Sequence, residues 1–139
     1  MALSDEVLSD DNPTPAANQP AVAPVAAFGN VDELFTRLQP DPEQPTEGEA
    51  LGTTMLYASL TEGAIDSGVW SCTVGAWDET DYAVNEVMVM VEGHLRITDT
   101  DGSVHDLTAG DMFYLPKGWS GRWDVVEDMK KIYVIVAGD

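Results

Sequence analysis

Positive charge, cysteine and long apolar segments are all scarce in this sequence, and each scarcity argues against a class of protein. Six Lys and Arg residues stand against 25 Asp and Glu residues, which gives a formal net charge of -19. Binding to a phosphate backbone or to an anionic membrane requires clustered cations, so neither nucleic acid nor membrane is an expected partner. We interpret the acidity as a solvated surface that specifies no chemistry.

The single cysteine, Cys72, excludes an internal disulfide and a zinc site built from several thiolates. No apolar run approaches the roughly 20 residues that a membrane-spanning helix needs. The opening residues, MALSDEVLSDD, also lack the basic and apolar regions of a signal peptide. We therefore expect a cytoplasmic protein without disulfides.

Composition divides the chain into three parts. Residues 1–27 form an acidic, Ala/Pro-rich stretch that buries too little apolar surface to offset the ordering entropy, which predicts a flexible tail. Residues 28–49 should hold a short helix, VDELFTRL, capped by Asn30 and Glu33, followed by a Pro-rich linker in which neither helix nor sheet can propagate. Residues 50–139 alternate short β-branched runs with turn residues, which is typical of an all-β sandwich or barrel.

Turn residues at regular spacing separate the candidate strands. Turns are expected at residues 99–102, 109–111 and 116–118, where Gly occurs with Asp or Pro. The candidate strands are TTMLYASL, GVWSCTV, VNEVMVMVEG, HLRITDT, SVHDL, DMFYLP, GRWDVV and KKIYVIVA. This number of strands suits a small closed barrel.

The strand around Glu86 is apolar on both of its faces. Met88 and Met90 share the side of Glu86, whereas the residues between them on the other side are valines. A strand that is buried on both sides is central, so one face should fill the barrel and the other should meet a second sheet or a partner subunit. The resulting hypothesis is a homodimer.

Two short stretches resemble the paired motifs of the cupin superfamily. The first is EVMVMVEG, which runs from Glu86 to Gly93, and the second is GDMFYLPKG, which contains Gly110, Pro116 and Gly118. The two motifs occur in the family's order and are separated by one hairpin. The resemblance implies an all-β, cupin-type β-barrel of the RmlC-like jelly-roll kind, also called a double-stranded β-helix, preceded by the short helix and the tail.

Residues 55–136 are similar to the cupin subgroup typified by the (S)-ureidoglycine aminohydrolase cupin domain. The stretches that carry the similarity are GVWSCTVGAW, NEVMVMVEGHLRITDTDG, AGDMFYLPKGWSGRWDV and KKIYV. The subgroup's activity is associated with a metal ion held by histidines. This chain has two histidines, His94 and His105, and both are expected at the surface.

The positions of the family's metal-binding histidines carry other residues in this chain. Thr80 and Tyr82 stand where the first motif has its two histidines, and Gly121 stands where the second motif has its histidine. A lone carboxylate such as Glu86 binds a divalent transition metal far more weakly than three histidines and a glutamate. We therefore predict no tightly bound metal and no cofactor.

The remaining side chains predict a small-molecule pocket with aromatic walls and one carboxylate. Glu86 and Tyr82 are the candidate catalytic residues, because a desolvated carboxyl group can serve as a general acid or base. Alternatively, Glu86 is hydrogen-bonded by its neighbours and merely closes the barrel. The cations clustered between residues 117 and 131 could hold a carboxylate ligand or Glu86 itself, or lie at the surface. The candidate ligand-binding residues are Trp70, Cys72, Met88, Tyr114, Trp123 and Lys131.

Structural roles are the alternative for several of these residues. Trp70 and Trp123 are expected as core or as pocket wall, since aromatic side chains at alternating strand positions commonly pack in cores. Cys72 should be a small buried hydrophobe, because no cation or histidine beside it in the sequence favours a thiolate.

Three functions stay open at this point. The first is a metal-free binding module for a small organic ligand, and the second is a hydrolase or isomerase that uses Glu86 and Tyr82 on a small polar metabolite. The third is a structural dimer or assembly unit. An open pocket would favour the first two, whereas a barrel filled by Met88 and Met90 would favour the third.

Overall fold

The computed structural model describes residues 22–41 and 50–137, and strands dominate this part of the chain. Most of the predicted tail and of the predicted linker lies outside the described residues. The helical segments are α1 (Val31–Leu34) and the 3-10 turn η2 (Phe35–Arg37). The strands are β1 (Gln39–Pro40), β2 (Gly52–Leu60), β3 (Ile65–Cys72), β4 (Gly75–Glu79), β5 (Asn85–Asp99), β6 (Val104–Thr108), β7 (Met112–Leu115) and β8 (Gly121–Val136).

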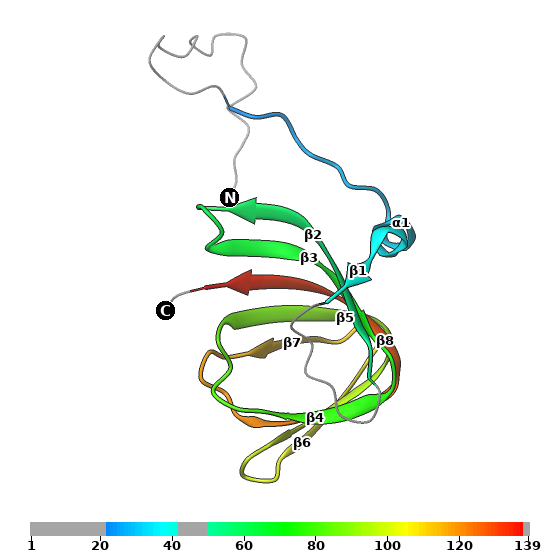
Figure 1. Cartoon of the computed structure of the whole chain (residues 1–139), viewed down its shortest axis with the longest axis vertical. Coiled ribbons are helices and arrows are strands. Elements are labelled where there is room, and N and C mark those ends of the chain that lie inside the picture. The colour runs from blue at the N-terminus through cyan, green and yellow to red at the C-terminus, as the bar shows by residue number, and fades with distance from the viewer. Residues whose placement is uncertain (1–21, 42–49, 138–139) are drawn as a thin grey trace.

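The strands form one antiparallel sheet that curls into a barrel (Figure 1). Its order is β1-β2-β3-β8-β5-β6, with β4 paired to β8 and β7 paired to β5. The long strands β5 and β8 pair with each other along most of their length and hold the two parts of the barrel together. The predicted all-β barrel is confirmed.

Two pairs of predicted strands are single bent strands. VNEVMVMVEG and HLRITDT are both part of β5, and GRWDVV and KKIYVIVA are both part of β8. The bend in β5 lies at Gly93, where φ is +91° and the register against β8 shifts on both sides. Such a bulge lets a strand continue while it turns around the barrel, whereas the sequence pattern shows only an interruption.

The predicted capping box at the short helix is confirmed. The Asn30 side chain accepts a hydrogen bond from the Glu33 backbone N–H, and the Glu33 carboxylate accepts one from the Asn30 N–H, both at 3.0 Å. Tyr57 of β2 holds the helix against the sheet by donating its hydroxyl to the Leu34 carbonyl at 2.6 Å. Within the described ranges, no helix has the length and apolar character needed to cross a membrane.

The segment after this helix contributes a strand that the sequence did not predict. Gln39 and Pro40 pair with Thr54 and Thr53 of β2. The expectation that sheet could not form in this Pro-rich segment is therefore wrong for two residues. An edge position tolerates proline, because its missing N–H is not required by a further neighbouring strand.

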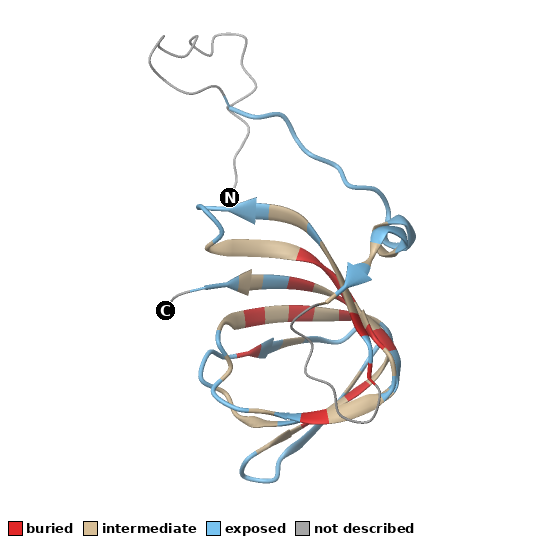
Figure 2. Cartoon of the chain, in the orientation of Figure 1, coloured by how far each residue is buried: buried red, intermediate tan, exposed pale blue. Residues whose placement is uncertain are grey.

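The core lies inside the barrel and follows β3, β5 and β8, as the buried segments in Figure 2 show. Met88 and Met90 are 0 % and 1 % exposed, which confirms the predicted inward face of β5. The valines on the other face of β5 are partly buried. The largest fully buried side chains are Met88, Met90, Leu95, Met129, Val69 and Val125.

The substitution Gly93→Ala is expected to destabilise the protein strongly. A Cβ atom at Gly93 would overlap the backbone carbonyl of Asp128, and the φ of +91° is unfavourable for any L side chain. Gly110→Ala is the matched control, because its φ is +96° but no atom lies within 4 Å of the added carbon. Urea unfolding should show a loss of roughly 1 kcal/mol at Gly110 and at least about 2–3 kcal/mol at Gly93. Equal losses would contradict the steric argument.

Candidate functional site

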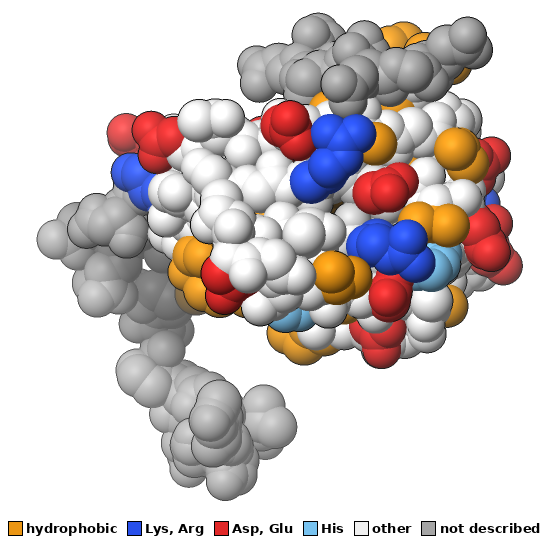
Figure 3. All heavy atoms as spheres, turned by 90° about the horizontal axis from the view of Figure 1, so that it is seen from below, with side chains coloured by type: hydrophobic (Ala, Val, Ile, Leu, Met, Phe, Trp, Pro, Cys, Tyr) orange, Lys and Arg blue, Asp and Glu red, His pale blue; other side chains and the backbone are white. Residues whose placement is uncertain are grey.

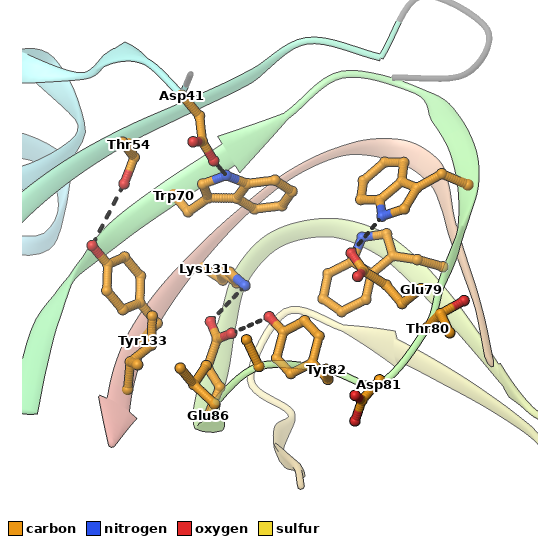
Figure 4. A pocket seen from close by; sticks show the side chains of 15 residues that line it. Asp41, Thr54, Trp70, Glu79, Thr80, Asp81, Tyr82, Glu86, Lys131 and Tyr133 are labelled. Carbon is orange, nitrogen blue, oxygen red and sulfur yellow. Dashed lines mark hydrogen bonds and ion pairs between the residues drawn. The ribbon is translucent and has the colours of Figure 1, made fainter. Parts of the chain in front are cut away.

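The barrel contains a cavity of about 500 Å³, a volume typical of small-molecule sites (Figure 4). Its walls come from β2, β3, β4, β5 and β8 and from the connection between β4 and β5. The lining residues are Asp41, Thr54, Trp70, Trp77, Glu79, Thr80, Asp81, Tyr82, Ala83, Val84, Glu86, Trp123, Lys131, Tyr133 and Ile135.

A buried ion pair lies at the centre of this cavity lining. Glu86 on β5 and Lys131 on β8 are 3 % and 4 % exposed, and Lys131 Nζ lies 2.8 Å from Glu86 Oε2. Both side chains point inward, because Glu86 and Met90 share one face of β5 and Met90 pairs with Lys131 across the sheet. Each charge compensates the other for the loss of hydration.

Tyr82 completes the environment of the carboxylate. Its hydroxyl donates to Glu86 Oε1 at 2.5 Å, so both oxygens of Glu86 have a partner. Lys131 also donates to Met88 Sδ at 3.0 Å. Burial, and next the neighbouring Glu86 carboxylate, raise the pKa of Tyr82 far above its ordinary value. The phenol therefore remains protonated and keeps its role as a donor.

Aromatic rings surround the Lys131 ammonium. Its Nζ lies 4.6 Å from the ring centroid of Trp70 and 5.1 Å from that of Trp123, within the range of cation–π attraction. Trp70 and Trp123 meet edge to face at 6.2 Å, and Trp77 stacks on Trp123 at 5.9 Å. Three tryptophans from three strands thus form one continuous aromatic wall.

Two of the three indole N–H groups are hydrogen-bonded to carboxylates of the lining. Trp70 Nε1 donates to Asp41 Oδ2 and Trp77 Nε1 donates to Glu79 Oε2, each at 2.9 Å (Figure 4). Trp123 Nε1 is buried and has no hydrogen-bond partner among the described residues. A buried donor without a partner costs about 1–3 kcal/mol of stability.

The residues that stand where the resemblance to cupins places metal ligands do not fit a divalent metal ion. Tyr82 is hydrogen-bonded to Glu86, Gly121 has no side chain, and the Lys131 ammonium lies against the Glu86 carboxylate. A metal ion on Glu86 would have to displace this ammonium or face its positive charge at short range. Within residues 22–41 and 50–137, no group of three or more His, Cys, Asp and Glu side chains could hold a metal.

Five of the predicted site residues line the cavity together: Trp70, Tyr82, Glu86, Trp123 and Lys131. Glu86 is hydrogen-bonded by Tyr82 and Lys131, as the alternative interpretation of this residue expected. Of the cations clustered between residues 117 and 131, Lys131 forms the ion pair with Glu86.

The other three predicted ligand-binding residues do not line the cavity. Cys72 is 2 % exposed and lies in the core, where burial raises the pKa of its thiol to about 12. Met88 is fully buried and reaches Lys131 through its sulfur. Tyr114 is exposed, because it pairs with Val87 on the outward face of the sheet, and it donates to the Asn85 side chain at 2.7 Å.

Several lining residues were missed in the sequence. Trp77 and Glu79 lie on β4, a strand too short and acidic to match a strand pattern. Asp41 precedes the predicted barrel and reaches the cavity after β1. The stacking of Trp77 on Trp123 depends on the pairing of β4 with β8, which the sequence pattern does not show.

Several other charged side chains form ion pairs away from the cavity. In the view of Figure 3, Lys and Arg side chains lie beside Asp and Glu side chains. His94 and His105 are likewise bonded to surface aspartates. The Lys and Arg pairs outside the cavity include Arg96 with Asp106 at 2.8 Å, Arg122 with Asp78 at 3.0 Å and Lys130 with Glu92 at 3.3 Å.

The antiparallel sheet that curls into a barrel is the architecture that the resemblance to cupins implies. Residues 60–133 match the family described as the EutQ-like cupin domain. This match spans more than half of the 139 residues, and the chain belongs to that family.

Solved structures share the same fold. The EutQ protein of Clostridium difficile superposes with a TM-score of 0.56 at 23 % identity, over 66 % of this chain and 71 % of that one. A protein of unknown function from Rhizobium leguminosarum gives 0.55 at 25 %, over 63 % and 82 %. A DUF861 family protein from Pseudomonas syringae gives 0.67 at 19 %, over 74 % and 46 %. No match was found among curated proteins.

The substitution Lys131→Met is expected to lower the free energy of unfolding by roughly 3 kcal/mol, because it leaves the Glu86 carboxylate buried without its cation. The double variant Glu86→Gln/Lys131→Met should regain most of that loss, since neither charge remains. Urea unfolding followed by tryptophan fluorescence measures all four members of the cycle. Additive losses would show that the two charges are not energetically coupled.

Proposed function

We propose that this chain is a small-molecule-binding cupin that works without a tightly bound metal ion. The observation that carries the proposal is the Lys131 ammonium, which lies 2.8 Å from Glu86, the residue at the position of the cupin metal-binding glutamate. A protein side chain supplies positive charge at a place where metal-binding cupins hold an ion.

The cavity supports ligand binding over a purely structural role. Met88 and Met90 fill the core, yet about 500 Å³ remains beside them, with aromatic walls and converging polar groups. Apolar walls with a few placed polar groups are typical of ligand pockets. A barrel that served only as an assembly unit would gain stability by filling this space.

An enzyme is the second candidate function, favoured by the contact between Tyr82 and Glu86. A protonated phenol and a carboxylate at hydrogen-bond distance beside a pocket are residue types that general acid–base catalysis uses. In this second proposal the chain is a hydrolase or isomerase that acts on a small polar metabolite. The metal-assisted hydrolysis of the ureidoglycine aminohydrolase subgroup is not part of it, because Thr80, Tyr82 and Gly121 replace the histidines.

Elemental analysis of the protein purified without an affinity tag tests the metal-free site, and we expect far less than one metal ion per chain. Thermal-shift titrations should show no stabilisation by divalent transition metals but stabilisation by a member of a small-metabolite panel.

Proton NMR of the stabilising compound then distinguishes the two candidate functions, a binding protein and an enzyme. An unchanged compound supports a binding protein, whereas conversion that Glu86→Gln abolishes supports an enzyme. Stoichiometric bound metal would overturn the proposal.

A homodimer is part of the same proposal. The outward face of the central sheet is apolar, with Val87 paired to Val134, which is 38 % exposed. A partner sheet would remove these side chains from water. Light scattering coupled to gel filtration should give twice the chain mass, and Val134→Lys should shift the protein to the monomer. A monomeric mass for the unmodified protein would contradict the dimer.

A further inference from the structure

The cavity has an excess of negative charge. Among the described residues that line it, the four carboxylates of Asp41, Glu79, Asp81 and Glu86 stand against the one ammonium of Lys131, which leaves a formal charge of -3. The ammonium is already paired with Glu86. The carboxylates of the cavity lining therefore repel an anionic ligand and attract a cationic one.

The rest of the molecule reinforces this preference. None of the other five Lys and Arg residues lines the cavity, and the whole chain has a formal net charge of -19. A field of one sign raises the local concentration of oppositely charged ligands and speeds their association. Small organic cations are thus favoured both at the cavity and on the approach to it.

The aromatic wall suits the same class of ligand. The ammonium of Lys131 over Trp70 and Trp123 shows that this wall accommodates a cation. Trp77 and Tyr82 add further ring surface to the lining, and Ile135 adds an aliphatic side chain. A ligand with a few carbon atoms next to its charge can pack against these groups.

We infer that the cavity binds a small organic cation, an amine or quaternary ammonium compound. This inference rests on the proposed small-molecule binding and names its ligand class. Glu79 and Asp81 attract the positive charge, and the aromatic wall contacts the carbon atoms.

Isothermal titration calorimetry with three compounds of nearly the same shape tests the charge preference. Choline carries a positive charge and a hydroxyl, 3,3-dimethyl-1-butanol replaces the nitrogen by carbon, and 3,3-dimethylbutanoate carries a negative charge. Choline should bind at least about tenfold more tightly than the neutral alcohol, and the anion should not bind. Added salt should weaken choline binding, since the attraction is screened.

Two variants, each of which removes one negative charge, test whether the lining carboxylate of Glu79 strengthens choline binding. Glu79→Gln should weaken choline binding by about fivefold, because it removes a lining charge but keeps an acceptor for Trp77. Asp78→Asn is the matched control: it lies next to Glu79 on β4, but its side chain is 72 % exposed and paired with Arg122 outside the cavity. The control should change choline affinity by less than about twofold.

The outcomes separate this inference from the proposed function. Selective binding of choline that Glu79→Gln weakens would support both. Equal or tighter binding of the neutral alcohol or the carboxylate would overturn the inference and leave small-molecule binding intact. Failure of all three compounds would overturn the inference, and the metabolite panel then decides separately whether the protein binds a small molecule.

Discussion

The pairing of Glu86 with Lys131 is the interaction on which the rest of the site depends. Two opposite charges at 2.8 Å, each less than a twentieth exposed, are tolerated in a barrel because each replaces the hydration of the other. The pair fixes where Tyr82 donates its hydrogen bond and where the aromatic wall meets a cation. The cavity is the space left beside this arrangement.

Strand geometry produces the pair. β5 and β8 run antiparallel, and their inward positions bring Glu86 and Lys131 together although the two residues are 45 positions apart. The bulge at Gly93 lets β5 continue into the other part of the barrel, where Leu95 is fully buried. One pair of strands therefore carries both the core and the polar site, and distortion of the bend would disturb both.

Local patterns predicted the fold better than the site. Turn residues and the two motif spacings were enough for the barrel, since they depend on neighbouring residues. The partner of Glu86 could not be predicted, because four of six cations were clustered in the sequence and only the register of β8 distinguishes Lys131. Trp77 and Glu79 were missed since β4 is recognisable as a strand only through its pairing with β8.

A lysine and a metal ion place positive charge in a barrel with different consequences. A metal ion offers open coordination positions and polarises what binds there, whereas an ammonium offers N–H donors and a charge that is already balanced by Glu86. On the proposed metal-free function, recognition then depends on the groups around the pair. These are the carboxylates of Glu79 and Asp81 and the tryptophan faces. On the same proposal, the barrel binds an organic cation where metal-binding members of the superfamily coordinate an ion.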